Sequence, residues 1–131
     1  MQIKEFEHGI HFENVLCRRT AEYALASVTG KPNFHISLAI DISPCCDCYP
    51  HNDAAIAEDV GMFASFDPVA LDTACADAVN AKASAKDSVL KGKKVTDKFT
   101  CVHPSTDWKA ATEHAERIGL GVRGYTIKRV E

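Results

Sequence analysis

The stretch from Asp41 to Asp53, Asp-Ile-Ser-Pro-Cys-Cys-Asp-Cys-Tyr-Pro-His-Asn-Asp, is the feature that most constrains this chain. It directly follows the most strand-like run of the sequence. Pro44 and Pro50 prevent it from forming regular helix or a central strand. Three thiols and one imidazole lie within it, and soft metal ions prefer these ligands. The sequence therefore predicts a loop at a strand end where a metal is bound or a thiol reacts.

The run before this loop, residues 34–42, places large apolar side chains at even positions and smaller or polar ones at odd positions. This alternation predicts a strand whose even face is buried. Ser37 and Ala39 on the odd face are small enough to lie under a helix. We therefore expect a central strand, with the cysteines just beyond its carboxyl end, where open α/β sheets place their ligands.

The remaining pattern predicts helices alternating with strands. A helical stripe from about residue 13 ends at Gly30, and a short apolar run at 60–65 reads as a strand. Asp67 and Pro68 open a helix that runs to about Ala83, and a polar loop covers residues 84–98. A further helix is capped by Ser105 or Thr106, and residues 122–130 alternate as a last strand. This order predicts an α/β domain in which helices pack on a single mostly parallel or mixed sheet.

Length and composition indicate one soluble domain over residues 1–131. The chain is 46% hydrophobic and 25% charged, and its formal charge of −3 gives no basic footprint for nucleic acid. No run is long enough to span a membrane, and no apolar signal segment opens the sequence. We therefore expect a cytoplasmic protein that binds neither nucleic acid nor membrane.

The cysteines favour metal or redox chemistry over a disulfide framework. There are six, and Cys17 and Cys75 lie on predicted helices, where a thiol packs as a small apolar group. In a reducing cytoplasm the other four are better placed as ligands. They are Cys45, Cys46 and Cys48 in the loop and Cys101 in a second short apolar segment, which also carries His103.

Two metal sites fit these residues. An iron–sulfur cluster needs four converging thiols, and Cys101 is the evident fourth. A zinc site with three cysteines and one histidine, from His51 or His103, needs fewer ligands to converge. The alternative without a metal is a loop bounded by prolines that holds partly buried thiols.

A series of separated motifs gives the chain a resemblance to a known family. In order these are residues 42–48, 59–61 and 64–72, then His103-Pro104, Asp107-Trp108, Ala115-Glu116, and residues 118–121 before Tyr125. From about residue 14 onward, this series resembles the C-terminal part of a prokaryotic family of domains of unknown function. Its members are commonly labelled uncharacterised iron–sulfur-centre proteins.

The resemblance implies that Cys46 and Cys48 are the family's cysteine pair, accompanied by Asp59 and residues 67–72. Cys45 lies at a position that the family does not restrict to cysteine. Family members are usually longer, which implies a fragment, a short form or one half of a split protein. The expected partner is accordingly a second copy or a separate chain that supplies the N-terminal part of the family.

Three functions follow from these observations. The first is an iron–sulfur or related metal protein with a redox or electron-transfer role, with the metal held by Cys46, Cys48, Cys45, Cys101 and His103. The second is a zinc-stabilised binding or assembly module. The third is a metal-dependent enzyme acting on a small substrate. The sequence contains no phosphate-binding loop, nucleophile elbow or zinc-protease motif to support a hydrolase.

Overall fold

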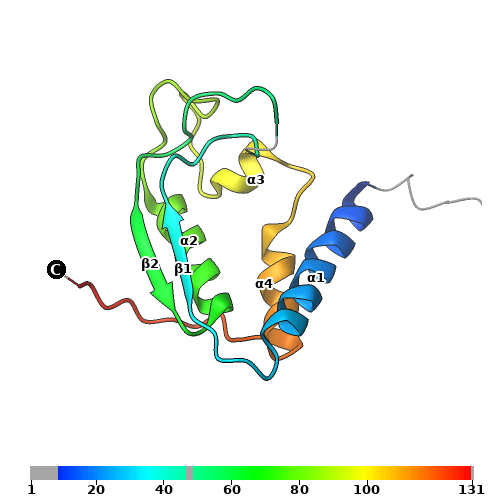
Figure 1. The fold of residues 1–131 in the computed structure, drawn as a ribbon. Coiled ribbons are helices and arrows are strands. Elements are labelled where there is room, and N and C mark those ends of the chain that lie inside the picture. Colours follow the sequence, from blue (N-terminus) through cyan, green and yellow to red (C-terminus); the bar gives the residue numbers. More distant parts are fainter. Residues whose placement is uncertain (1–8, 47–48, 131) are drawn as a thin grey trace, which may run out of the picture.

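The computed structural model describes residues 9–46 and 49–130, and side chains from residue 14 onward. Within them the elements follow the order α1 (Gly9–Val28), β1 (His35–Ala39), β2 (Gly61–Ser65), α2 (Pro68–Ala81), α3 (Lys98–Val102) and α4 (Trp108–Arg117). Figure 1 shows β1 and β2 side by side with α2 packed against them, while α4 and α1 form a separate helical layer. No helix of the described residues is long and apolar enough to cross a membrane.

The sheet differs from the one that the sequence predicts. In the described part of the chain it has two strands, and they are antiparallel, with His35 opposite Ser65 and Ala39 opposite Gly61. The expectation of a single mostly parallel or mixed sheet is therefore wrong. Short strand and helix segments in alternation favour parallel crossovers, but β2 follows β1 through a loop without a helix and returns along it in the opposite direction.

The two faces of β1 also differ from expectation. The odd face lies against α2, as the small side chains Ser37 and Ala39 predict, and Ala39 is buried in a cluster with Ala57 and Val79. The even face, with Ile36 and Leu38, is exposed, although it carries the larger apolar side chains. Both faces of this strand are suitable for burial, so the alternation alone did not decide which one α2 would cover.

The start of α2 is set by local chemistry that the sequence predicts. Asp67 has an extended backbone and its Oδ1 accepts hydrogen bonds from the N–H groups of Val69 (2.9 Å) and Ala70 (3.0 Å). Pro68 occupies the first helical position, where a missing N–H costs nothing. The helix ends at Ala81, two residues earlier than expected. For α4, the cap is Asp107 rather than Ser105 or Thr106.

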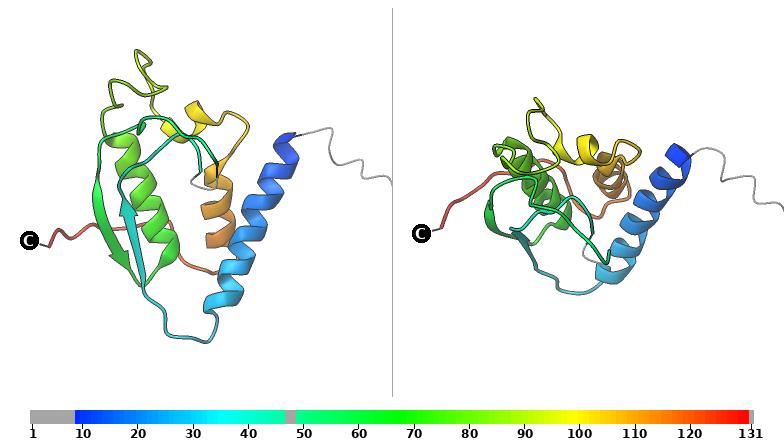
Figure 2. Two further views of the ribbon diagram at one scale, coloured as in Figure 1. Left: turned by 45° about the horizontal axis from the view of Figure 1, so that its top comes forward. Right: turned by 90° about the horizontal axis from the view of Figure 1, so that it is seen from above.

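Residues 122–130 form no strand, contrary to the sequence prediction. After α4 ends at Arg117, the chain turns near the start of α2 and these residues run past β2 (Figures 1 and 2). Asp67 Oδ2 accepts from the N–H of Val122 (2.9 Å), and the Tyr125 hydroxyl donates to Asp77 Oδ2 on α2 (2.9 Å). Side-chain anchors therefore hold this segment, and no backbone hydrogen bond joins residues 125–130 to β2.

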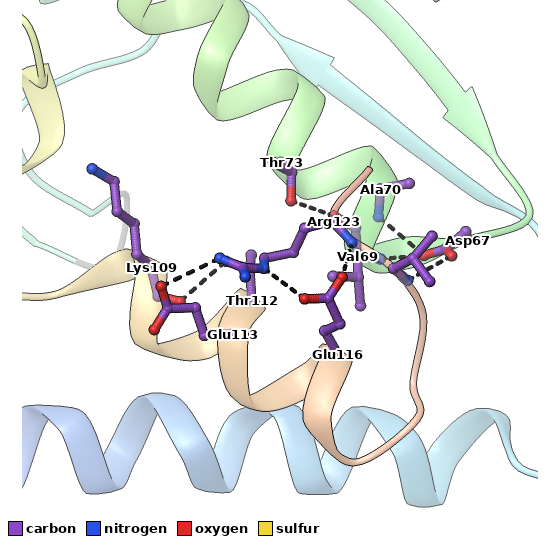
Figure 3. A network of polar contacts seen from close by, with 10 residues as sticks. Asp67, Val69, Ala70, Thr73, Lys109, Thr112, Glu113, Glu116 and Arg123 are labelled. Atoms are coloured by element: carbon purple, nitrogen blue, oxygen red, sulfur yellow. Dashed lines mark hydrogen bonds and ion pairs between the residues drawn. The ribbon is translucent and has the colours of Figure 1, made fainter. Parts of the chain in front are cut away.

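A charged network fixes the same segment to α4 (Figure 3). Glu116 accepts the backbone N–H of Arg123 at 2.8 Å and its Nε at 2.9 Å, while Arg123 Nη1 lies 3.3 Å from Glu113 Oε1. The hydrogen bonds from Arg123 lower the pKa of Glu116. Asp67 lies in the same view at the start of α2, so the turn after α4 is tied to both helices.

Candidate thiol site

The loop of residues 41–53, called the cysteine loop below, lies at the same end of the molecule as α3 (Figure 1). It leaves β1 through Asp41, whose φ of 48° is unusual for a residue with a side chain. The Asp41 N–H donates to Asp59 Oδ1 at 2.9 Å, and the Ile56 N–H donates to the Ile42 carbonyl at 2.7 Å. These bonds close the base of the loop, so its position depends on the end of β1.

One amide side chain organises the cysteine loop around Cys45. Asn52 Nδ2 donates to Ser43 Oγ (2.8 Å) and to the Cys45 carbonyl (3.0 Å), and its Oδ1 accepts from the N–H groups of Cys45 (3.2 Å) and Asp53 (3.0 Å). Sequence reasoning assigned Asn52 no role. The available signal was its type, because asparagine readily bonds to nearby backbone in turns.

A distant segment reaches the loop from α3. Cys101 lies on this short helix and His103 is its C-cap residue. His103 Nε2 donates to the Pro44 carbonyl at 2.6 Å, across 59 positions of sequence. In a neutral imidazole this leaves Nδ1 without a proton, because only one ring nitrogen then carries hydrogen. Ligating histidines show this pattern, with one nitrogen on the metal and the other donating to a backbone carbonyl.

The two segments, with Val89, Leu90 and Lys93 of the loop before α3, line a cavity of about 420 Å³. The side chains around it with chemistry of interest are Cys45, His51, Asp53, Lys93, Cys101 and His103. The structure therefore places Cys101 and His103 around the same cavity as Cys45, although the two cysteines are 56 positions apart in the sequence. The cavity has the donor types that a soft metal prefers, together with one ammonium group.

A complete metal site is not preformed in the part of the chain that the structure describes. Within it, no group of three or more histidine, cysteine, aspartate or glutamate residues is arranged to hold a metal ion. Cys46 is exposed, outside the list of residues that line the cavity, and Cys48 lies outside the described residues. Of the five predicted ligands, the structure gathers Cys45, Cys101 and His103 around one cavity and does not bring Cys46 into it.

The family comparison supports part of the resemblance. The model of a family described as Domain of unknown function (DUF362) matches residues 3–77, more than half of the chain. This chain belongs to the DUF362 family. No curated protein and no solved structure matches it.

The DUF362 match divides the candidate site. It includes the cysteine loop, β1, β2 and most of α2, but it ends before Cys101 and His103. The sequence resemblance ran on to Tyr125, whereas the match lies in the N-terminal part of this chain. The motifs after residue 77 are therefore outside the part of the chain for which family membership is shown.

Cys75 contrasts with the thiols of the cysteine loop. It lies on α2 against β1, where it interacts with Ser37. Burial raises the pKa of this thiol, and the nearby Asp72 carboxylate raises it further. Because the thiolate is the form that binds metals and attacks electrophiles, Cys75 is suited to packing. This agrees with its sequence-based interpretation as a small apolar group, and it makes Cys75 a control for the site cysteines.

Proposed function

We propose that this DUF362 chain is a thiol-based metal protein that holds an iron–sulfur cluster and serves in electron transfer. Its ligands are drawn from Cys45, Cys46, Cys48, Cys101 and His103. When bound, such a cluster supplies reversible one-electron transfer. The proposal includes the correspondence to the C-terminal part of longer iron–sulfur-centre relatives and a reducing cytoplasm that keeps the thiols available.

The observation that carries the proposal is the common cavity of the cysteine loop and the α3 segment. Cys45, Cys101 and His103 line it together, and the bond from His103 Nε2 to the Pro44 carbonyl holds the two segments in contact. In a neutral ring that bond leaves Nδ1 as the nitrogen able to bind a metal, which is the pattern that ligating histidines show. Sequence distance makes this convergence informative, because packing alone does not require a cysteine and a histidine at both sides of one cavity.

Binding requires the cysteine loop to contribute more than Cys45. The described residues do not arrange three ligand groups to hold a metal ion. The proposal therefore needs Cys46 and Cys48 as further ligands. Lys93 lines the same cavity, and its ammonium would offset the negative charge of a cluster held by thiolates. The roles of this chain's residues are therefore ligation by the loop and α3, and charge compensation by Lys93.

A specific observation favours a second candidate, a zinc-stabilised assembly module. The cavity combines two cysteines with His51 and His103, and mixed cysteine and histidine sets are typical of structural zinc. The exposed apolar face of β1 and β2 also suits a protein that associates with another polypeptide. In this candidate the zinc ion would hold the cysteine loop against α3, and its oxidation state would not change.

Metal analysis of anaerobically purified protein distinguishes the two candidates. Iron and acid-labile sulfide, with a visible charge-transfer band, are expected for the cluster. Stoichiometric zinc, with a melting temperature that falls on chelation, would instead support the zinc-stabilised module and contradict the cluster. Cys46→Ser and Cys48→Ser are expected to lower the metal content, whereas Cys75→Ser is expected to retain it. Protein that contains neither metal after anaerobic reconstitution would contradict both candidates.

A further inference from the structure

One face of the two-stranded sheet is apolar and uncovered in the described structure. Opposite pairs on this face are Ile36 with Ala64 and Leu38 with Met62. Ile36, Leu38 and Met62 are 61%, 59% and 69% exposed. The same face continues through three more exposed side chains, Phe34, Ile40 and Phe66, and the two phenylalanine rings meet edge to face with centroids 5.0 Å apart.

The extent of this face is that of an interface. From their exposed fractions, the six large side chains present on the order of 700–800 Å² of apolar surface, close to the roughly 800 Å² per partner of a standard protein interface. Scattered exposed apolar residues are normal on a protein, but a contiguous patch of this size marks a binding surface.

The sheet is open at an edge as well. β2 pairs with β1 on one side, and on the other it lines a groove of about 580 Å³ together with α2 and residues 125–130. Every residue of β2 contributes to this groove, so it follows the strand for its full length. No backbone hydrogen bond is found between β2 and residues 125–130, both of which the structure describes. The edge groups of β2 therefore remain available for another strand.

The charges of the groove indicate the character of its occupant. Its lining is mostly apolar side chains and small residues of β2 and α2. The charged residues of the lining, all of which the structure describes, are Lys128 and Arg129. An extended segment with alternating apolar side chains and flanking carboxylates complements both the apolar walls and these two cations.

A second copy of this chain fits the groove less well. In a symmetric pair each β2 edge would face the other, but residues 125–130 lie along that edge. Lys128 and Arg129 of the two copies would also approach one another, and like charges at a contact are unfavourable. The edge therefore favours a separate polypeptide over self-association.

We propose that an extended segment of a separate polypeptide adds to β2 in this groove, between the strand and residues 125–130. The segment has alternating apolar side chains with carboxylates at its ends. Strand addition pairs the backbone N–H and C=O groups at the edge of β2 with those of the added segment. The apolar walls and the two cations of the groove then determine which segment sequences bind. This interaction is independent of the metal in the cysteine loop.

Fluorescence anisotropy with a labelled synthetic peptide tests the proposal. The probe alternates valine and threonine and carries two glutamates at each end. We expect it to bind the full-length chain, and we expect a version methylated on alternate backbone nitrogens to lose binding at least tenfold. Equal binding of both versions, or no binding of either, would overturn strand addition.

A charge-reversal variant tests whether the peptide binds beside Lys128 and Arg129. The double variant Lys128→Glu, Arg129→Glu is expected to bind the glutamate-ended peptide at least tenfold more weakly and to bind a lysine-ended peptide more tightly. The control, Lys86→Glu with Lys94→Glu, changes the same charge away from the groove and is expected to leave binding unchanged. Amide hydrogen exchange is expected to slow in residues 61–65 when the peptide binds. A dimer of the unliganded chain in sedimentation experiments, with residues 61–65 protected, would instead assign the edge to a second copy and refute the proposal.

Discussion

At the residue scale, Asp67 joins two parts of the fold through one carboxylate. Its Oδ1 caps α2, and its Oδ2 accepts the N–H of Val122 from the segment after α4. Gly121 makes this approach possible, because a Cβ at that position would overlap Asp67 Oδ1 and lie 2.7 Å from Cγ. The sequence predicts the cap from Asp67 and Pro68, but the contact with Gly121 spans more than 50 residues and has no local signal.

We predict that Gly121→Ala destabilises the protein by about 2–3 kcal/mol, because Asp67 must move and lose its cap and its bond to Val122. Urea unfolding measures this loss. Gly124→Ala is the matched control, since no atom lies within 4 Å of the Cβ that it adds. Similar unfolding midpoints for the two variants would show that the segment shifts freely and that Asp67 does not anchor it.

At the same scale, the cysteine loop shows that residue type alone does not predict which side chain organises the loop. The sequence picks out the thiols, His103 and the prolines because each has a distinct chemistry. Asn52 has none that stands out, yet it makes four hydrogen bonds across the loop. Its role depends on the loop conformation, which the sequence pattern does not give.

At the element scale, a buried lysine holds the C-terminal end of α2. The Lys98 side chain is 1% exposed, and its Nζ donates to the carbonyls of Asn80 (2.8 Å) and Lys82 (2.6 Å). The last carbonyls of a helix lack partners within it and carry partial negative charge, so a cation there is favourable. Burial lowers the pKa of this ammonium, because the charged form loses hydration.

We predict that Lys98→Met lowers the free energy of unfolding by about 2–3 kcal/mol, because it leaves two carbonyls at the end of α2 without their charged donor. The exposed Lys94 provides the control, and Lys94→Met is expected to change stability by less than about 0.5 kcal/mol. Equilibrium urea unfolding compares them. A neutral or stabilising Lys98→Met would mean that the cost of burying the ammonium cancels its hydrogen bonds.

The strands show where sequence prediction stops at this scale. Alternation identifies residues 34–42 as a strand and a short apolar run identifies residues 60–65 as another, and the structure has β1 and β2 within these runs. Strand direction and pairing depend on distant parts of the chain, so the parallel sheet was wrong. Residues 122–130 have the alternation of a strand, but residues 125–130 make no backbone hydrogen bond to β2, which they run past. Local pattern therefore gave the strands but not the sheet.

At the scale of the whole molecule, the candidate site depends on the contact between two distant segments. Residue chemistry selected Cys45, Cys101 and His103 as candidate ligands, but only the fold places them around one cavity. The His103–Pro44 hydrogen bond links α3 directly to the cysteine loop. The α1–α4 layer and the anchored C-terminal segment lie outside the residues that line this cavity. We propose that this contact builds a single metal site.

The contribution of α3 is tested by the metal content per chain of anaerobically prepared Cys101→Ser, compared with the unchanged protein and with Cys75→Ser. If α3 completes the site, Cys101→Ser is expected to lose most of its metal, while Cys75→Ser keeps it, because Cys75 faces β1 and not the cavity. Full metal content in Cys101→Ser, with the metal still lost in Cys46→Ser, would contradict the shared site and confine the metal to the cysteine loop.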